Sequence, residues 1–136
     1  NRETLTKLFA SARGGFILAT EGMEGLRDCE GKPPALVIAT RMPLPSPREP
    51  LWEALGEQVR AHGGNLRFAL SHPAAVLKLK RELAPFRKDG LKTIWLLDAR
   101  ASSEGLGAYA AKALDCEAVV APDLNALQVL TRETFG

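Results

Sequence analysis

Cysteine is scarce in this chain: Cys29 and Cys116 are the only two, and they lie far apart in the sequence. No Cys-x-x-Cys pair occurs, and neither does a Cys/His spacing typical of metal ligands. Neither a disulfide framework nor a zinc site is therefore predicted. We expect both cysteines to be small buried thiols.

Long apolar runs are missing too. No stretch approaches the roughly 20 apolar residues of a membrane-spanning helix, and the N-terminus at Asn1 has no charged-then-apolar leader pattern. Internal repeats, low-complexity tracts and interdomain linkers are absent as well. We therefore expect a single domain over residues 1–136, a cytoplasmic location and no membrane partner.

The composition is that of an ordinary globular protein, with 46% hydrophobic and 25% charged residues. The formal net charge is only +2. Such a charge permits contact with nucleic acid without demonstrating it, because local clustering of basic residues matters more than the total.

Short apolar runs alternate with segments of helical period along the chain. Strands are predicted at 16–20, 35–40, 93–98 and 118–120, and helices at 3–12, 48–62, 71 to a break or kink near Pro85, 102–114 and 123–133. Inward positions are expected at Leu51, Leu55, Val59, Val76, Leu77, Leu79, Leu83 and Trp95. Apolar strands alternating with amphipathic helices indicate the α/β class, with a parallel sheet covered on both faces.

Recognisable catalytic signatures are few. No G-x-x-x-x-G-K-[ST] phosphate loop is present, so the chain alone is not expected to hydrolyse ATP in that way. His62 and His72 have no Ser, Cys or carboxylate partner at a known catalytic spacing. Residues 105–110 match G-x-G-x-x-A, for which we expect a packing role at a helix start, with nucleotide binding as the alternative.

The densest basic cluster contains Lys78, Lys80, Arg81, Arg87, Lys88 and Lys92. Glu82 and Asp89 interrupt it. Such a run is either a solvated helix face or a surface for nucleic-acid phosphates, and the sequence leaves both open.

Several collinear segments have a recognisable order. Residues 35–51 (ALVIATRMPLPSPREPL) form an apolar strand, a basic residue and a proline-studded loop, followed by Gly63-Gly64-Asn65, a P-x-A-x-x-x-L-K stretch from Pro73, and L-L-D-x-R ending at Arg100. Upstream, residues 18–31 (LATEGMEGLRDCEG) resemble a motif V. Together these segments resemble the second motor domain of DinG- and XPD-type DNA helicases of superfamily 2.

The resemblance implies a RecA-like, three-layer domain with a mainly parallel sheet flanked by helices, truncated at its N-terminus. It implies contact with single-stranded DNA and with ATP and Mg²⁺ held by a first motor domain, in DNA repair or replication. Nucleic-acid contacts would come from Thr20, Glu24, Arg41, Lys78, Lys80 and Lys88, and nucleotide contacts from Glu24, Gly25 and Asp28.

Motif VI departs from the family pattern. Residues 81–88 (RELAPFRK) stand where the family has Q-G-x-G-R-x-x-R. Loss of an arginine finger lowers phosphoryl-transfer rates by about 10³ to 10⁵, so Arg81 or Arg87 would have to act as a displaced finger. The alternative is a catalytically inactive helicase-like module that binds DNA or protein.

Overall fold

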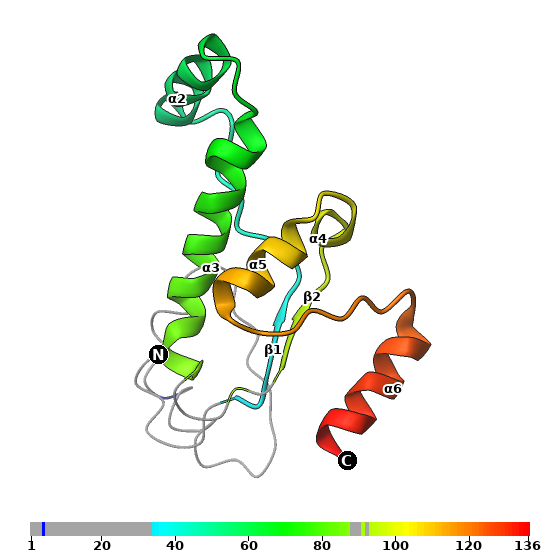
Figure 1. Ribbon diagram of the computed structural model, residues 1–136. Helices are drawn as coiled ribbons and strands as arrows, with labels where there is room; N and C mark the ends of the chain where they lie inside the picture. The colour runs from blue at the N-terminus through cyan, green and yellow to red at the C-terminus, as the bar shows by residue number, and fades with distance from the viewer. Residues whose placement is uncertain (1–3, 5–33, 88–90, 92) are drawn as a thin grey trace.

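Two parallel strands joined by a long helical crossover form the centre of the molecule (Figure 1). The computed structural model describes Thr4, residues 34–87, Leu91 and residues 93–136. Apart from Thr4, the predicted helix at 3–12 and the predicted strand at 16–20 lie outside the described residues. The described elements are β1 (Leu36–Ala39), α2 (Pro50–Ala61), the π-helical turn η2 (Arg67–Ser71), α3 (His72–Arg87), β2 (Thr93–Leu96), α4 (Ala99–Ser103), α5 (Leu106–Leu114) and α6 (Leu124–Phe135).

The sheet confirms the mixed α/β class. β1 and β2 pair in parallel, from Leu36 opposite Thr93 to Ala39 opposite Leu96. The predicted strand at 118–120 is wrong, because these residues form no regular structure. Val119 and Val120 are 64% and 70% exposed, so their apolar side chains gain little burial where they lie.

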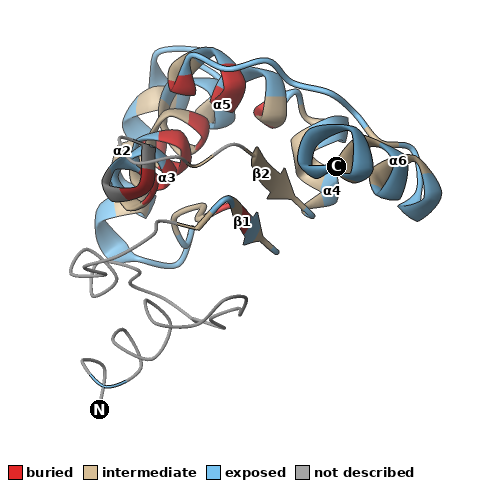
Figure 2. Cartoon of the chain, turned by 90° about the horizontal axis from the view of Figure 1, so that it is seen from below, coloured by how far each residue is buried: buried red, intermediate tan, exposed pale blue. Residues whose placement is uncertain are grey.

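The core lies between the sheet and the helices α3 and α5. Figure 2 shows the buried residues concentrated on these two helices. Val37 is buried on the sheet, with Ile94 and Leu96 of β2 packed against the same cluster. The fully or nearly fully buried residues of the helices are Ala75, Val76, Leu79, Leu83, Phe86, Leu106, Ala110 and Leu114.

The buried residues of α3 lie along one face of the helix, and the predicted core positions on that face are right. The predicted residues Val76, Leu79 and Leu83 are buried, as the helical period requires. Leu77 was predicted inward but is 69% exposed. Two residues correspond to about 200° around a helix, so Leu77 must point away when Leu79 points in.

Helix α2 stands apart from the core at one end of the molecule (Figure 1). Gly56 is its only buried residue, and a Cβ placed there would lie 3.3 Å from Leu66 Cδ1. Leu51, predicted inward, is 67% exposed because this helix meets little of the chain. The helix begins at Pro50 and ends before Gly63, whose positive φ of 71° supports the predicted glycine stop.

The observed ends of the other helices can also be compared with the predicted ones. Helix α3 continues past Pro85 to Arg87. The single helix predicted at 102–114 is two helices, because Gly105 adopts a φ of 68° between α4 and α5. Helix α6 starts as predicted, since the Asp123 carboxylate accepts a hydrogen bond from Ala126 N at 2.8 Å.

Trp95 and Cys116 were both predicted to be buried, but both lie outside the core. Trp95 is half-buried and absent from the core cluster. Its partner Ile38 is 48% exposed on the same face of the sheet, opposite α3 and α5. Cys116, predicted to be a buried thiol, is exposed where it follows Asp115, the left-handed residue that ends α5. Cys29 lies outside the described residues.

Two leucines of α3 allow a matched test of this core. Leu83→Ala removes a side chain with no exposed surface and should destabilise the protein by about 2 to 5 kcal/mol, through lost burial and the cavity left behind. Leu77→Ala should change the free energy of unfolding by less than about 0.5 kcal/mol. Urea denaturation measures both; equal effects would contradict the placement of α3.

Candidate functional site

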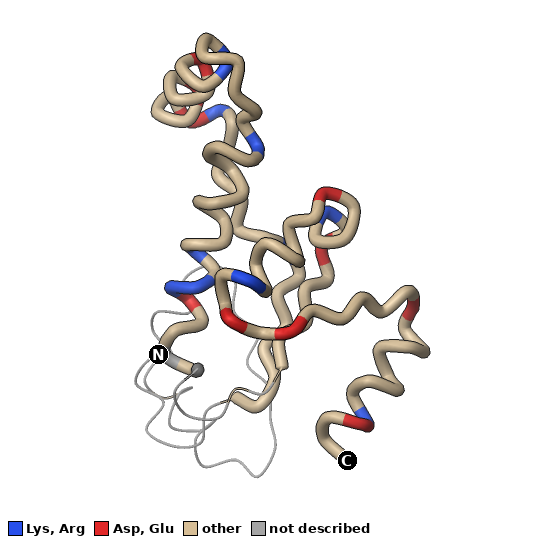
Figure 3. The backbone as a smooth tube through the Cα atoms, in the orientation of Figure 1, with Lys and Arg blue, Asp and Glu red and all other residues tan. Residues whose placement is uncertain are grey.

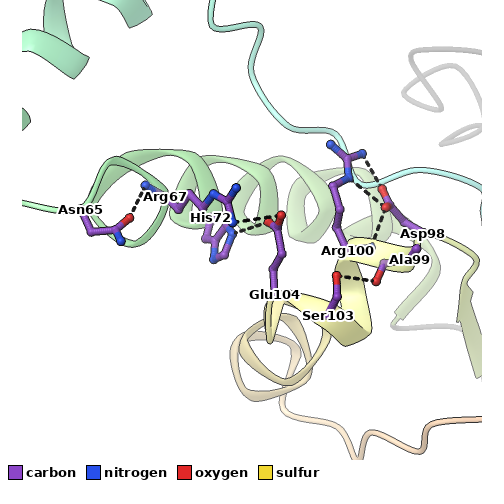
Figure 4. Close-up of polar contacts among 8 residues, drawn as sticks. All are labelled: Asn65, Arg67, His72, Asp98, Ala99, Arg100, Ser103 and Glu104. Carbon is purple, nitrogen blue, oxygen red and sulfur yellow. Dashed lines mark hydrogen bonds and ion pairs between the residues drawn. The ribbon is translucent and has the colours of Figure 1, made fainter.

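The carboxyl ends of the two strands meet at one edge of the sheet, where parallel α/β proteins commonly bind ligands. Asp98 follows β2 there, and its Oδ2 accepts a hydrogen bond from the backbone N–H of Met42, beyond the end of β1, at 2.9 Å. Arg100 donates Nε to Oδ1 at 2.9 Å and Nη2 to Oδ2 at 2.6 Å (Figure 4). The Arg100 backbone N–H also reaches Oδ1, at 3.0 Å. One carboxylate thus ties both strand ends to the first turn of α4.

The charge of this carboxylate is strongly favoured. The hydrogen bonds from the Arg100 side chain hold the pKa of Asp98 well below its usual range. Burial opposes this shift, while the Met42 and Arg100 N–H groups and the charge of Arg100 support it. In return, the bonds to Asp98 raise the pKa of Arg100. Both groups are therefore ionised at neutral pH.

A second polar cluster lies beside the first (Figure 4). Glu104, at the end of α4, places Oε1 3.1 Å from Arg67 Nη1 and Oε2 3.5 Å from His72 Nε2. The Phe68 ring meets the His72 ring edge-on, with centroids 5.3 Å apart. Glu104 thus links η2 and the start of α3 to the turn between α4 and α5.

His72 is enclosed at this point. Its side chain is only 4% exposed, and Nε2 has no hydrogen bond from any described residue; Glu104 lies at ion-pair distance only. A general base must reach a proton on a substrate. Because the imidazole is almost completely shut off from solvent, it cannot reach a substrate proton in the described conformation.

In both ion pairs the arginine side chain is more exposed to solvent than its carboxylate partner. Arg100 is 41% exposed against 7% for Asp98, and Arg67 is 63% exposed against 22% for Glu104. Arg41, one residue before Met42, is exposed as well. A guanidinium carries five N–H donors, of which Asp98 takes two from Arg100. The edge therefore presents arginine donors outward and keeps its carboxylates inward.

The structure separates the other predicted nucleic-acid residues from this edge. Lys78, Lys80 and Arg81 lie six to nine residues along α3 from His72, which corresponds to roughly 9 to 14 Å along the helix axis. Figure 3 shows these basic residues about mid-way along α3. Lys78 and Lys80 also point about 160° apart, since each residue turns the helix by about 100°.

The remaining predicted site residues are only partly placed. Arg87 is the last residue of α3. Thr20, Glu24, Gly25, Asp28 and Lys88 lie outside the described residues.

Sequence reasoning missed the role of both carboxylates. Asp98 belonged to a quoted motif, but its partner Met42 lies 56 residues away and donates a backbone N–H, which no side-chain pattern reveals. Glu104 supplies the carboxylate that His72 lacked at any recognisable sequence spacing. An aspartate directly after an apolar strand was the one available signal.

The glycine-rich stretch at 105–110 has the predicted packing role. Leu106 and Ala110 are fully buried in the core. A Cβ added to Gly107 would stand 2.9 Å from Ala101 O, so the glycine permits the close approach of α5 to α4.

Within the described ranges, no group of three or more His, Cys, Asp or Glu side chains could hold a metal ion. None of the described helices has both the length and the apolar character needed to cross a membrane. No protein-family model matches the chain. No curated protein matches it, and no solved structure matches it.

The Asp98 interactions predict a pH dependence of stability. The pKa of this carboxyl is lowered on folding, so its contribution is fully present above the ordinary value of 3.8 and is lost as the pH falls further. Asp98→Asn should cost about 1.5 to 3 kcal/mol at neutral pH and should remove this part of the acid sensitivity. Urea titrations at several pH values test it, with the exposed Glu57→Gln as control; an unchanged acid profile in Asp98→Asn would contradict the assignment.

Proposed function

We propose that this chain binds single-stranded DNA at the carboxyl edge of its parallel strands, as the second motor domain of a DinG- or XPD-like helicase acting in DNA repair or replication. The observation that carries the proposal is the outward display of arginines at this edge over inward carboxylates. Guanidinium groups bind phosphate through paired N–H donors.

The arrangement of the resembling segments supports the same proposal. The loop after β1 and the L-L-D-x-R segment after β2 lie far apart in the sequence. The bond from Met42 N–H to Asp98 joins them at one edge. Segments that were matched only by their order along the chain are therefore neighbours in space, as parts of one binding surface should be.

Each arginine has a distinct part in this proposal. Arg100 binds the Asp98 carboxylate, and Arg41 directly precedes Met42, whose N–H donates to it; both arginines would contact phosphates of an extended strand. Arg67 would continue this line over η2, where the neighbouring Phe68 is 66% exposed and offers a ring to a base. Phosphate contacts of this kind give affinity without sequence preference.

The finer fold and the nucleotide belong to the proposal as well. The βαβ unit would be part of a three-layer RecA-like domain. ATP and Mg²⁺ would be held by a first motor domain, and the present chain would close the cleft over them.

Arg41→Ala tests the DNA interface. Removing one phosphate contact should weaken binding of a fluorescent oligothymidylate and reduce the slope of log K against log salt by about 0.7, the value for single strands. Fluorescence anisotropy across a salt series measures this slope. Arg132→Ala, at an exposed position in the last turn of α6, is the matched control and should leave the slope unchanged. Equal losses in both variants would mean diffuse charge attraction and would sink the proposed interface.

A second candidate function, a helicase-like module without motor activity, is favoured by residues 81–88, which depart from the motif VI pattern of the resembling family. The arginines left in this segment are Arg81, mid-way along α3, and Arg87, its last residue. A finger must touch the transferring phosphate to stabilise its charge. The helix would then serve only as a scaffold for the DNA-binding edge.

DNA-stimulated ATP hydrolysis by the full-length protein separates the two functions. If a displaced finger operates, changing Arg81 and Arg87 together to alanine should lower the stimulated rate by about 10³ to 10⁵, while DNA binding persists. If neither the wild-type protein nor the variant hydrolyses ATP, but both bind DNA, the protein is the inactive helicase-like module.

A further inference from the structure

Among the described residues, no strand pairs with the outer edge of β2, called here its free edge. Thr93 N–H donates to Ala35 O at 3.2 Å and Leu97 N–H to Ala39 O at 2.9 Å, so these residues face β1. In a parallel ladder alternate residues bond to the same neighbour. The backbone N–H and C=O groups of Ile94 and Leu96 therefore point to the other side, where no described strand lies.

A groove of about 590 Å³ runs along this edge. Thr93, Ile94 and Trp95 line one side, and Leu127 and Leu130 of α6 line the other. Val119 and Ala121 also border it. The groove is thus bounded by a strand edge, an amphipathic helix and the segment that connects α5 to that helix.

The connecting segment, residues 117–121 (Glu-Ala-Val-Val-Ala), has the character of a buried strand. It is short, apolar and β-branched at its centre, as strands of parallel sheets are. Nevertheless Val119 and Val120 are mostly exposed. It follows β2 through the helices α4 and α5, which is the connection that parallel neighbouring strands require.

The apolar side chains of helix α6 are also incompletely buried. None of its residues is buried, although Leu127 and Leu130 face the groove and are half-buried. Figure 1 shows α6 set apart from the helices that cover the sheet. Segment 117–121 leads directly into α6 at Leu124. Movement of the segment to the sheet would therefore carry the helix with it.

We propose that segment 117–121 is a strap that closes onto the free edge of β2 as a third parallel strand. Closure pairs the outward N–H and C=O groups of Ile94 and Leu96, buries the two valines and brings α6 over the groove. Because parallel strands end at the same edge, it also carries Asp123 and the start of α6 to the edge that holds Asp98. The described conformation is the open state, and this device is independent of DNA binding.

Amide hydrogen exchange on the whole chain tests the strap. In the wild-type protein the amides of Ile94 and Leu96 should be protected, although the open state leaves them unpaired. The double variant Val119→Pro/Val120→Pro removes two N–H donors and should lower that protection on the order of 10-fold or more. Protection of the Leu79 and Leu83 amides in α3 should not change, which shows that the core stays folded.

Matched variants and a second readout make the result decisive. Val119→Thr/Val120→Thr keeps the branched side chains and the N–H donors, and should retain the protection of Ile94 and Leu96. In a Trp52→Phe background, acrylamide should quench Trp95 less in the threonine variant than in the proline variant. Rapid wild-type exchange at Ile94 and Leu96 that the prolines do not alter would overturn the strap. Protection that rises with protein concentration would overturn it too, since the edge would then pair with a second copy.

Discussion

The carboxylate of Asp98 is the contact on which the described architecture depends. It accepts hydrogen bonds from Met42, beyond the end of β1, and from the backbone and side chain of Arg100 at the start of α4. The two strands have only four residues each, so their ladder alone is a weak constraint. The half-buried charge of Asp98, with its four donors, holds the two strand ends and the start of α4 together.

The core and the polar edge are connected through α3 and α5. The apolar stripe of α3 packs on α5, while the first residue of α3, His72, meets Glu104 just before α5. Glu104 is in turn held near Asp98 by the short helix α4. Burial of the stripe therefore also sets the geometry of the arginines, and a change in the packing of these helices would move the edge with them.

Local features were predictable from the sequence, and distant ones were not. The stripe through Val76, Leu79 and Leu83, the Gly63 stop and the Asp123 cap depend on spacings of a few residues, which a sequence displays directly. Leu51 was misplaced because a helix can have an apolar face with little to pack against. The partners of Asp98 and His72 lie 56 and 32 positions away, so only the folded chain brings them together. The predicted strand at 118–120 is unpaired in the described conformation, because β propensity alone does not place a segment beside another strand.

The separation of 56 residues between Met42 and Asp98 has a consequence for synthesis. A ribosome adds about 5 to 20 residues per second, so β1 waits roughly 3 to 11 seconds for the strand that pairs with it. During that interval Val37 and Ile38 have no β2 against which to be covered. Loop closure over such a distance also slows folding compared with local contacts. The nascent chain thus carries an unpaired apolar strand for seconds, the period in which chaperone binding would matter most.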